Sequence, residues 1–290
     1  LKQLALQAWE GREMGPVDPF YRQPIPILSH HPDPFWGRPS SLVDWCEPNY
    51  VHSRYVAELF NTLSSLPMLL VGLRGLWLAH HYSLEARVYL CWAGIGAVGI
   101  GSMLFHGTLQ FYGQAADELP MIYASLLFTY AAVEVSNAAP RWRWLPLIEG
   151  VYALGFTVAY FTSPFIFPVF VAAYALAVLL IIFQSYRVYA LYREDQGKAG
   201  RWQRSLFWVA ATFYPGGFLL LWVPENALCP LYPRIFQSLN LHAVFHLVTT
   251  VSPYCYIVFM TYHRCTVLRR PAEHRPGGGL PYVHVLREAP

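Results

Sequence analysis

The chain has 290 residues, of which 55% are hydrophobic and 13% charged, about half the charged share of a soluble globular domain. Its apolar residues form uninterrupted runs of about 20, the length with which a helix crosses a bilayer. The net charge is only +3, and the basic residues are scattered. Composition therefore excludes an ordinary soluble protein and gives no support to nucleic-acid binding.

Residues 1–43 are rich in proline and turn-forming residues, which do not sustain a helix or a packed core. We expect a mobile or loosely packed arm and assign it no function. Residues 44–265 form the predicted membrane domain, and residues 266–290 form a tail.

Seven apolar runs of near-spanning length follow the arm. They lie at residues 59–79, 88–107, 119–135, 145–161, 165–186, 206–223 and 239–262. Tryptophan and tyrosine occur near many of their ends, as is typical of the level of the lipid headgroups. The pattern predicts an all-α membrane protein with seven transmembrane helices.

The basic residues predict the orientation, because arginine and lysine in short loops stay on the cytosolic side. If the N-terminus is outside, most basic loop residues, such as Arg141, Arg187 and Arg204, face the cytosol. The loops between helices on the outer side then contain only Arg234. We therefore predict a lumenal or outside N-terminus and a cytosolic C-terminus.

Three histidines are predicted to meet at the outer end of this bundle. His242 and His246 are four residues apart, so they share one helical face, either as ligands of one metal or as a pair of interhelical hydrogen bonds. His106 ends the second run, at the same side of the membrane as the start of the seventh. Three imidazoles with an open fourth position are typical of catalytic zinc, whereas structural zinc usually recruits cysteine as well.

Two further polar residues lie near these histidines. Ser102 precedes His106 by four residues and therefore lies on the same face, although its glycine-rich surroundings are equally typical of helix packing. Asp117 and Glu118 open the third run on the same side. One of these acids can cap the helix, and the other can transfer a proton.

The segment from Asp44 to Tyr50 contains three side chains with oxygen ligands, Asp44, Glu47 and Asn49, and Glu58 follows at the start of the first helix. Hard oxygens in a tight loop suit calcium, but the same composition is typical of a turn with solvated acids. Cys46 in this loop and Cys229 between the sixth and seventh runs both face outside. They are able to form a disulfide in an oxidising lumen.

Several motifs together resemble one family over residues 43–283. They are Asp44-Trp45-Cys46-Glu47-x-Asn49-Tyr50, Glu58-x-x-Asn61-Thr62, Ser102-x-x-x-His106, Gly113-Gln114-x-x-Asp117-Glu118, His242-x-x-x-His246 and Gly279-Leu280-Pro281-Tyr282-Val283. The chain resembles the alkaline ceramidases, seven-helix intramembrane hydrolases of the endoplasmic reticulum and Golgi. This resemblance implies hydrolysis of the ceramide amide to a sphingoid base and a free fatty acid, with no protein partner inferred.

The resemblance also implies roles for individual residues. The positions of His106, His242 and His246 bind zinc in that family, and those of Ser102 and Asp117 take part in catalysis. The calcium site corresponds to Asp44, Trp45, Glu47, Asn49 and Glu58, with Trp45 contributing its backbone carbonyl.

Three other functions remain open on the sequence alone. A lipid receptor related to the adiponectin receptors would share the fold and the zinc triad, but it would not need both Ser102 and Asp117. A lipase acting on glycolipid anchors fits the 44–50 loop and the tail less well. A transporter is disfavoured because the chain lacks paired, glycine- or proline-interrupted helices in two related halves.

Overall fold

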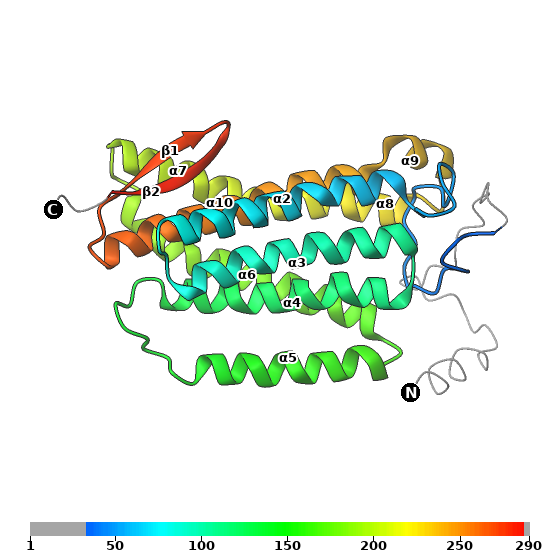
Figure 1. Cartoon of the computed structure of the whole chain (residues 1–290), viewed down its shortest axis with the longest axis horizontal. Helices are drawn as coiled ribbons and strands as arrows, with labels where there is room; N and C mark the ends of the chain where they lie inside the picture. Colours follow the sequence, from blue (N-terminus) through cyan, green and yellow to red (C-terminus); the bar gives the residue numbers. More distant parts are fainter. Residues whose placement is uncertain (1–32, 287–290) are drawn as a thin grey trace.

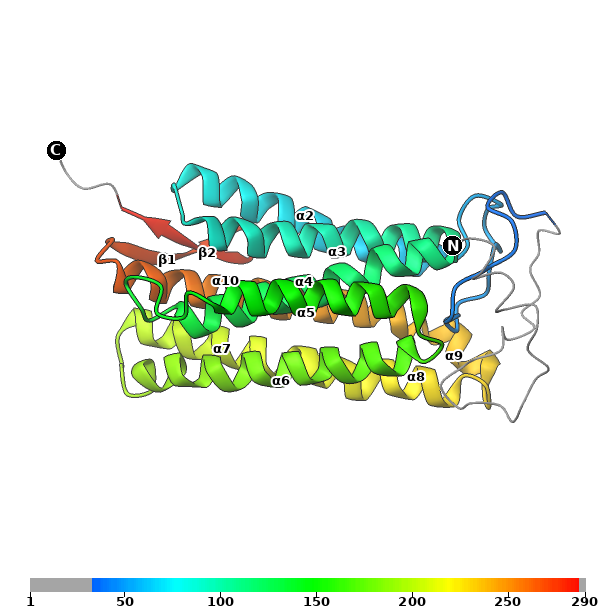
Figure 2. The ribbon, with the colours of Figure 1, turned by 90° about the horizontal axis from the view of Figure 1, so that it is seen from below.

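The computed structural model describes residues 33–286, and the long helices run side by side along its longest axis (Figures 1 and 2). Its elements are α2 (Leu59–His81), α3 (Ala86–Thr108), α4 (Phe111–Glu134), α5 (Leu145–Thr162), α6 (Ile166–Tyr192), α7 (Lys198–Gly217), the π-helical turn η1 (Phe218–Trp222), α8 (Val223–Leu228), α9 (Pro233–Leu239), α10 (Leu241–Val267), β1 (Ala272–Gly277) and β2 (Leu280–Val285). The chain therefore passes up and down a helical bundle, as the apolar runs predict.

Six segments of the described chain are long and apolar enough to cross a membrane. They are α2, α3, α5, α6, α10 and the continuous stretch Lys198–Leu228. The helix α4 has 24 residues, but its buried face carries Gln114, Asp117 and Glu118. These polar residues explain why α4 is not among the six, so the seventh span stays a prediction.

Glycine residues allow α3 to contact both of its neighbours closely. A Cβ atom at Gly101 would lie 1.8 Å from the carbonyl oxygen of Ala116 in α4, and one at Gly72 of α2 would lie 2.7 Å from the Cα atom of Gly96. Backbones approach this closely only where side chains are absent. The contact at Gly101 holds the helix of Ser102 and His106 directly against the helix of Asp117.

The path from α7 to α8 is not a single regular α-helix. The five-residue π-helical turn η1 interrupts it, and Pro215 lies just before this turn. A π-helical turn rotates the helix that follows it and occurs often beside functional sites. This turn sets which side chains of α8 face the bundle.

The tail contains a β-hairpin, which the all-α prediction omits. Strands β1 and β2 pair antiparallel from Ala272 opposite Val285 to Gly277 opposite Leu280. The two residues of the turn, Gly278 and Gly279, have φ angles of +63° and +93°, a conformation that favours glycine. The hairpin lies at the opposite end of the bundle from the 44–50 loop (Figure 1).

Two polar side chains of the bundle fasten the hairpin. Arg74 of α2 donates to the carbonyl of Leu280 at 3.1 Å and also bonds the hydroxyl of Tyr254. The Tyr254 hydroxyl donates to the carbonyl of Pro281 at 2.8 Å. An arginine inside a predicted span is costly unless it is paired, and the turn of the hairpin supplies its partners.

The end of the N-terminal arm is attached to the α3–α4 turn. The backbone N–H groups of Ser40 and Ser41 donate to the carbonyl of Leu109, and that of Leu42 donates to the side chain of Gln114 at 2.6 Å. Most of the predicted arm, residues 1–32, lies outside the described residues.

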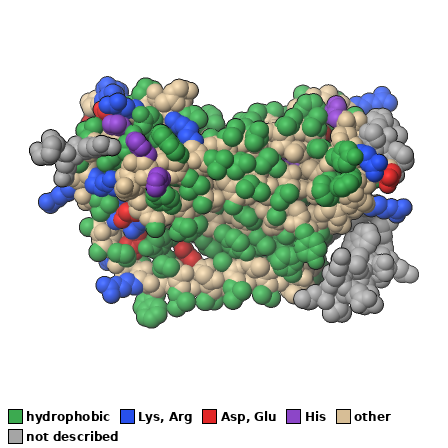
Figure 3. Space-filling model, viewed as in Figure 1, with side chains coloured by type: hydrophobic (Ala, Val, Ile, Leu, Met, Phe, Trp, Pro, Cys, Tyr) green, Lys and Arg blue, Asp and Glu red, His purple; other side chains and the backbone are tan. Residues whose placement is uncertain are grey.

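Apolar side chains cover the middle of the molecule, and lysine and arginine gather toward its two ends (Figure 3). Large exposed side chains such as Leu70, Leu154 and Phe183 contribute to this apolar belt. Such a surface is stable in lipid rather than in water. The structure is therefore that of an integral membrane protein.

Candidate metal centre and active site

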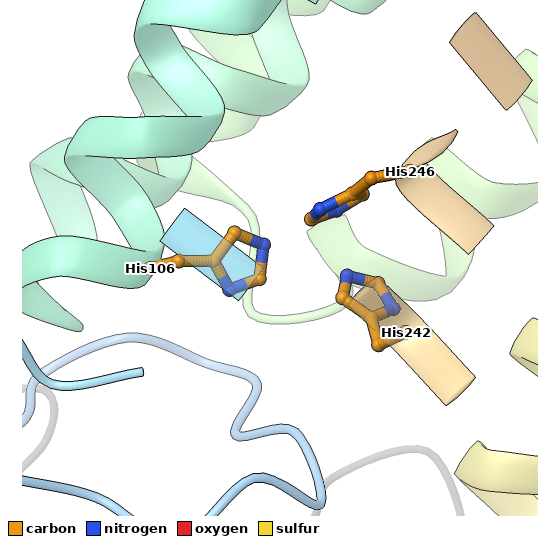
Figure 4. A group of neighbouring side chains, drawn as sticks. All are labelled: His106, His242 and His246. Atoms are coloured by element: carbon orange, nitrogen blue, oxygen red, sulfur yellow. The ribbon is translucent and has the colours of Figure 1, made fainter. Parts of the chain in front are cut away.

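The three predicted histidines meet in the bundle. His106 comes from the last turn of α3, and His242 and His246 come from the first turns of α10 (Figure 4). Their ligand nitrogens lie within 4.8 Å of one another, and all three side chains are buried. Across residues 33–286, no other group of three or more histidine, cysteine or acidic side chains meets this distance.

The polar neighbours of His106 and His246 contact the Nδ1 atom of each ring. The Nδ1 atom of His106 lies 2.5 Å from a carboxylate oxygen of Glu58, while its Nε2 atom is buried without a hydrogen-bond partner. The Nδ1 atom of His246 lies 2.9 Å from the Ser64 hydroxyl and 3.2 Å from that of Ser65. A buried nitrogen without a partner is rare, and a metal-bound histidine typically bonds a polar group through its other nitrogen.

His242 is held on its ring face and at its backbone. The indole of Trp45 stacks on its imidazole, with 3.6 Å between the ring centroids and 14° between the planes. Its backbone N–H donates to the carboxylate of Glu225 at 2.6 Å. The 44–50 loop and α8 thus position this histidine from two sides.

Ser102 belongs to the same hydrogen-bonded cluster. Its hydroxyl lies 2.9 Å from that of Ser65, which also contacts His246. Asp117 is buried and lines the same cavity as Ser102 and the two histidines of α10. The structure therefore places both predicted catalytic side chains on the wall of the cavity that the two α10 histidines also line.

Glu118 has a different environment from its neighbour Asp117. One of its carboxylate oxygens accepts the amide of Gln114 at 2.8 Å, and the other accepts the Tyr160 hydroxyl at 2.7 Å. The prediction that one of these two acids caps the helix is wrong, because α4 begins at Phe111 and its first turn contains no acid. Glu118 instead joins α4 to α5.

A long apolar cavity extends from the triad into the bundle. It passes Phe128 of α4, Phe170 and Ile181 of α6, and Phe207 of α7, and it reaches Phe259 of α10. Phe259 lies 13 residues beyond His246, about 20 Å along an α-helix. The cavity is long and lined mainly by apolar side chains, which suits an alkyl chain beside a small polar centre.

The five predicted calcium ligands are all buried within one compact region. The Asn49 amide donates to both carboxylate oxygens of Asp44, at 3.1 and 3.0 Å. Glu47 accepts the backbone N–H groups of Phe60 and Asn61 at 2.7 and 2.8 Å, so it caps the start of α2. Glu58 accepts the N–H of Trp45 at 3.2 Å.

These oxygens do not converge as closely as the three imidazoles do. Their chemistry nevertheless suits a hard cation, because Glu47 and Glu58 form no ion pair with a lysine or arginine of the described chain. The Asn49 amide oxygen is buried without a hydrogen-bond partner. Burial raises the pKa of Glu47, although the N–H groups of Phe60 and Asn61 oppose this shift.

The predicted disulfide between Cys46 and Cys229 is present, with 6.0 Å between the Cα atoms. It joins the 44–50 loop to the end of α8. The other three cysteines, Cys91, Cys255 and Cys265, are free and buried.

Sequence reasoning missed several residues around the triad. Glu225, Ser64, Ser65 and the indole of Trp45 contact the histidines or their backbone. Glu225 could have been suspected from the sequence, because an acid at the end of an apolar run is energetically costly in a membrane and needs a polar partner. Its partner is far away in sequence, and no local pattern indicates it.

Known proteins match nearly the whole chain. A model of the ceramidase family matches residues 37–280. Alkaline ceramidase 3 of Mus musculus is 31% identical over 246 residues, which cover 81% of this chain and 88% of the mouse protein. The alkaline ceramidase of Arabidopsis thaliana is 30% identical over 257 residues, covering 87% of this chain and 95% of the plant protein. The matched range 37–280 spans the triad, the 44–50 loop and the cavity, and the chain belongs to the ceramidase family.

Proposed function

We propose that this protein is a zinc-dependent ceramide amidohydrolase that releases a sphingoid base and a free fatty acid within the membrane. One observation carries the proposal: three buried imidazoles converge in a member of the ceramidase family, and two of them, His242 and His246, line a cavity together with Ser102 and Asp117. The polar centre can cleave an amide, and the apolar cavity can hold the lipid chain attached to it.

The donor set fits zinc. The three ligands are neutral imidazoles, His106 Nε2 has no partner among the described protein atoms, and no cysteine closes the site. A zinc ion held by His106, His242 and His246 would polarise the amide carbonyl and lower the pKa of a water toward about 7.

Asp117 is the proposed general base and acid. Its carboxylate takes a proton from the attacking water as the water oxygen bonds the carbonyl carbon. It then returns that proton to the amide nitrogen as the carbon–nitrogen bond breaks. The acyl part leaves as a fatty acid that keeps the oxygen of the water, and the nitrogen, with the transferred proton, leaves on the sphingoid base.

Ser102 is the proposed donor to the carbonyl oxygen. Negative charge develops on that oxygen when water adds, and a hydroxyl donor already in place stabilises it. Ser65, which also contacts His246, holds Ser102 at one side of the cavity.

The 44–50 loop and Glu58 are the proposed calcium site. Asp44, Glu47, Asn49, Glu58 and the carbonyl of Trp45 would supply the hard oxygens that calcium prefers. Because Glu58 also bonds His106 and Trp45 stacks on His242, an ion in this loop would stabilise both zinc-bearing helices. Its proposed role is structural.

The proposed setting is a membrane of the endoplasmic reticulum or Golgi, with the triad toward the lumen and the hairpin in the cytosol. The disulfide at the triad end supports this orientation, because disulfides persist in oxidising compartments. Labelling of single introduced cysteines at both ends in sealed vesicles tests it.

Release of fatty acid from ceramide by the purified protein in detergent tests the activity. The assay is run at alkaline pH with calcium, before and after zinc removal, and bound metals are measured on the same samples. We expect release that is lost with zinc and restored by its return. Bound zinc without release from any ceramide would contradict the proposal and would favour a receptor-like function.

A further inference from the structure

We propose that Glu225 is a positioning residue for the zinc ligand His242, because it caps the helix that carries this histidine and joins that helix to the 44–50 loop. The inference rests on the proposed zinc site. It assigns a role to an acid that lies outside both predicted metal sites.

The contacts of Glu225 are short and distributed over both of its oxygens. Its side chain is 1% exposed. Its Oε2 atom accepts the backbone N–H of His242 at 2.6 Å, and its Oε1 atom accepts that of Cys46 at 3.1 Å. One carboxylate therefore bonds two segments that are far apart in sequence, and each oxygen serves one of them.

The bond to His242 replaces a missing helix cap. The residue before α10 is Asn240, whose φ of 47° is left-handed and whose side chain makes no capping bond. His242 is the second residue of α10, and the N–H at this position is one that a capping side chain ordinarily accepts. Glu225 supplies that acceptor from α8, and its negative charge also suits the positive end of the α10 dipole.

The π-helical turn before α8 explains how Glu225 reaches this position. Trp222 ends the turn, and Glu225 follows three residues later on the same side of the helix. The Trp222 ring packs 5.5 Å from that of Trp45, which itself stacks on His242. The end of this span therefore contacts the loop through Trp222 and the histidine-bearing helix through Glu225.

The Cys46–Cys229 disulfide is a second link between the 44–50 loop and the end of α8. Cys46 is bonded to Cys229, and the N–H of Cys229 donates to the carbonyl of Glu225 at 3.0 Å. The carboxylate, the disulfide and α8 thus form one closed unit around the start of α10. A shift of His242 relative to His106 would have to break part of this unit.

The test compares Glu225→Gln and Glu225→Ala with a matched control, Glu134→Gln. Glu134 is also fully buried and also accepts two backbone N–H groups, those of Arg141 and Trp142, but it lies at the hairpin end. Zinc affinity is measured by chelator competition, and the geometry of the site is followed by the absorption bands of cobalt in the same site. Thermal stability is recorded for each protein.

We expect both Glu225 variants to bind zinc about 10- to 100-fold more weakly than the wild type and to change the cobalt spectrum. The control should lose stability with zinc affinity and spectrum unchanged. Wild-type affinity and spectrum in the Glu225 variants, or an equal loss of affinity in the control, would overturn the proposal. If the alanine variant does not fold, the glutamine variant decides, because it keeps only one acceptor oxygen.

Hydrogen exchange in metal-free protein separates this inference from the proposed function. Glu225→Ala should accelerate amide exchange in the peptide of residues 240–246, where the His242 N–H loses its acceptor. Unchanged exchange would overturn the capping role whatever the metal content. A wild-type protein that binds neither zinc nor cobalt would contradict the proposed zinc site, and the exchange result would still decide the role of Glu225.

Discussion

The two ends of the bundle bury charge in opposite ways. At the hairpin end, the guanidinium of Arg264 is buried and bonds both oxygens of Glu85, at 2.6 and 2.8 Å. At the triad end, Glu47 and Glu58 are buried without a lysine or arginine partner within residues 33–286. The hairpin end neutralises its buried charges with its own side chains, whereas the triad end has buried acids and imidazoles that are able to bind cations.

Because of this difference, substitutions at the two ends should affect different properties of the protein. A buried ion pair holds helices together without any ligand, and removing one partner leaves the other uncompensated. A group of buried acids and imidazoles without basic partners is stable only with bound cations or protons. Substitutions at the hairpin end should therefore lower stability alone, while those at the triad end should change metal binding and turnover.

The largest expected effect comes from His242→Ala. Removing one of three ligands should abolish zinc binding and lower hydrolysis to the level of the uncatalysed reaction, because the polarised carbonyl and the acidified water are lost together. Metal analysis and fatty-acid release on the same sample measure both. Hydrolysis by a verified zinc-free His242→Ala protein would contradict the metal mechanism.

Asp117→Asn should separate zinc binding from catalysis. The amide cannot accept a proton, so we expect turnover to fall by about 10²- to 10⁴-fold, with zinc content unchanged. Glu118→Asn is unsuitable as a control because Glu118 joins α4 to α5 through Tyr160. Glu194→Gln, an exposed change at the other end, is a better control. Near-normal turnover in Asp117→Asn would exclude Asp117 as the base.

Glu85→Gln should act at the hairpin end and only on stability. We expect a loss of about 2 kcal/mol, less than for a fully buried pair, because the side chain of Glu85 is 31% exposed. Zinc content and turnover per folded molecule should match the wild type. Thermal unfolding in detergent measures the loss, and reduced zinc affinity would break the proposed separation of the two ends.

The same pair predicts an acid dependence of stability. The hydrogen bonds from Arg264 lower the pKa of Glu85 in the folded protein. Its stabilisation is therefore complete above the pKa of an unfolded glutamate, about 4.3, and disappears as the pH falls through the lower folded value. Wild type and Glu85→Gln should differ most near neutral pH and converge in acid, and a gap that widened in acid would contradict this assignment.

Glu47→Gln should have the smallest effect on turnover. The amide keeps one acceptor for the start of α2 but removes a negative charge from the proposed calcium site, so calcium affinity should fall by about tenfold or more. At saturating calcium, turnover should stay close to that of the wild type. Calcium titration of activity and of thermal stability measures the shift, and an unchanged titration would remove Glu47 from the site.

The triad could be predicted because its geometry depends on simple rules. A spacing of four residues places His242 and His246 on one face, and alternating helices bring the end of α3 beside the start of α10. The disulfide could be predicted in the same way, because the alternating direction of the spans places Cys46 and Cys229 on the same side of the membrane. These inferences require only the order of the spans and their direction.

The remaining features depend on contacts that the local sequence does not indicate. The predicted start of α4 is too late because Gln114, Asp117 and Glu118 interrupt the apolar pattern of its first two turns, although all three side chains are buried. The role of Glu225 depends on a π-helical turn and on partners 17 and 179 residues away. The sequence prediction omits the hairpin, although Gly278 and Gly279 indicate a tight turn, because it treats residues 266–290 only as a tail.

The disulfide also has a consequence for the time at which the protein matures. Its two cysteines are separated by 183 residues, which a ribosome needs roughly 10 to 40 s to add at about 5 to 20 residues per second. During that interval Cys46 lacks its partner Cys229, and the first 240 residues contain only one of the three triad histidines. The three histidines therefore cannot meet until α10 has been synthesised, and a chain that stalls before α10 has only one of them.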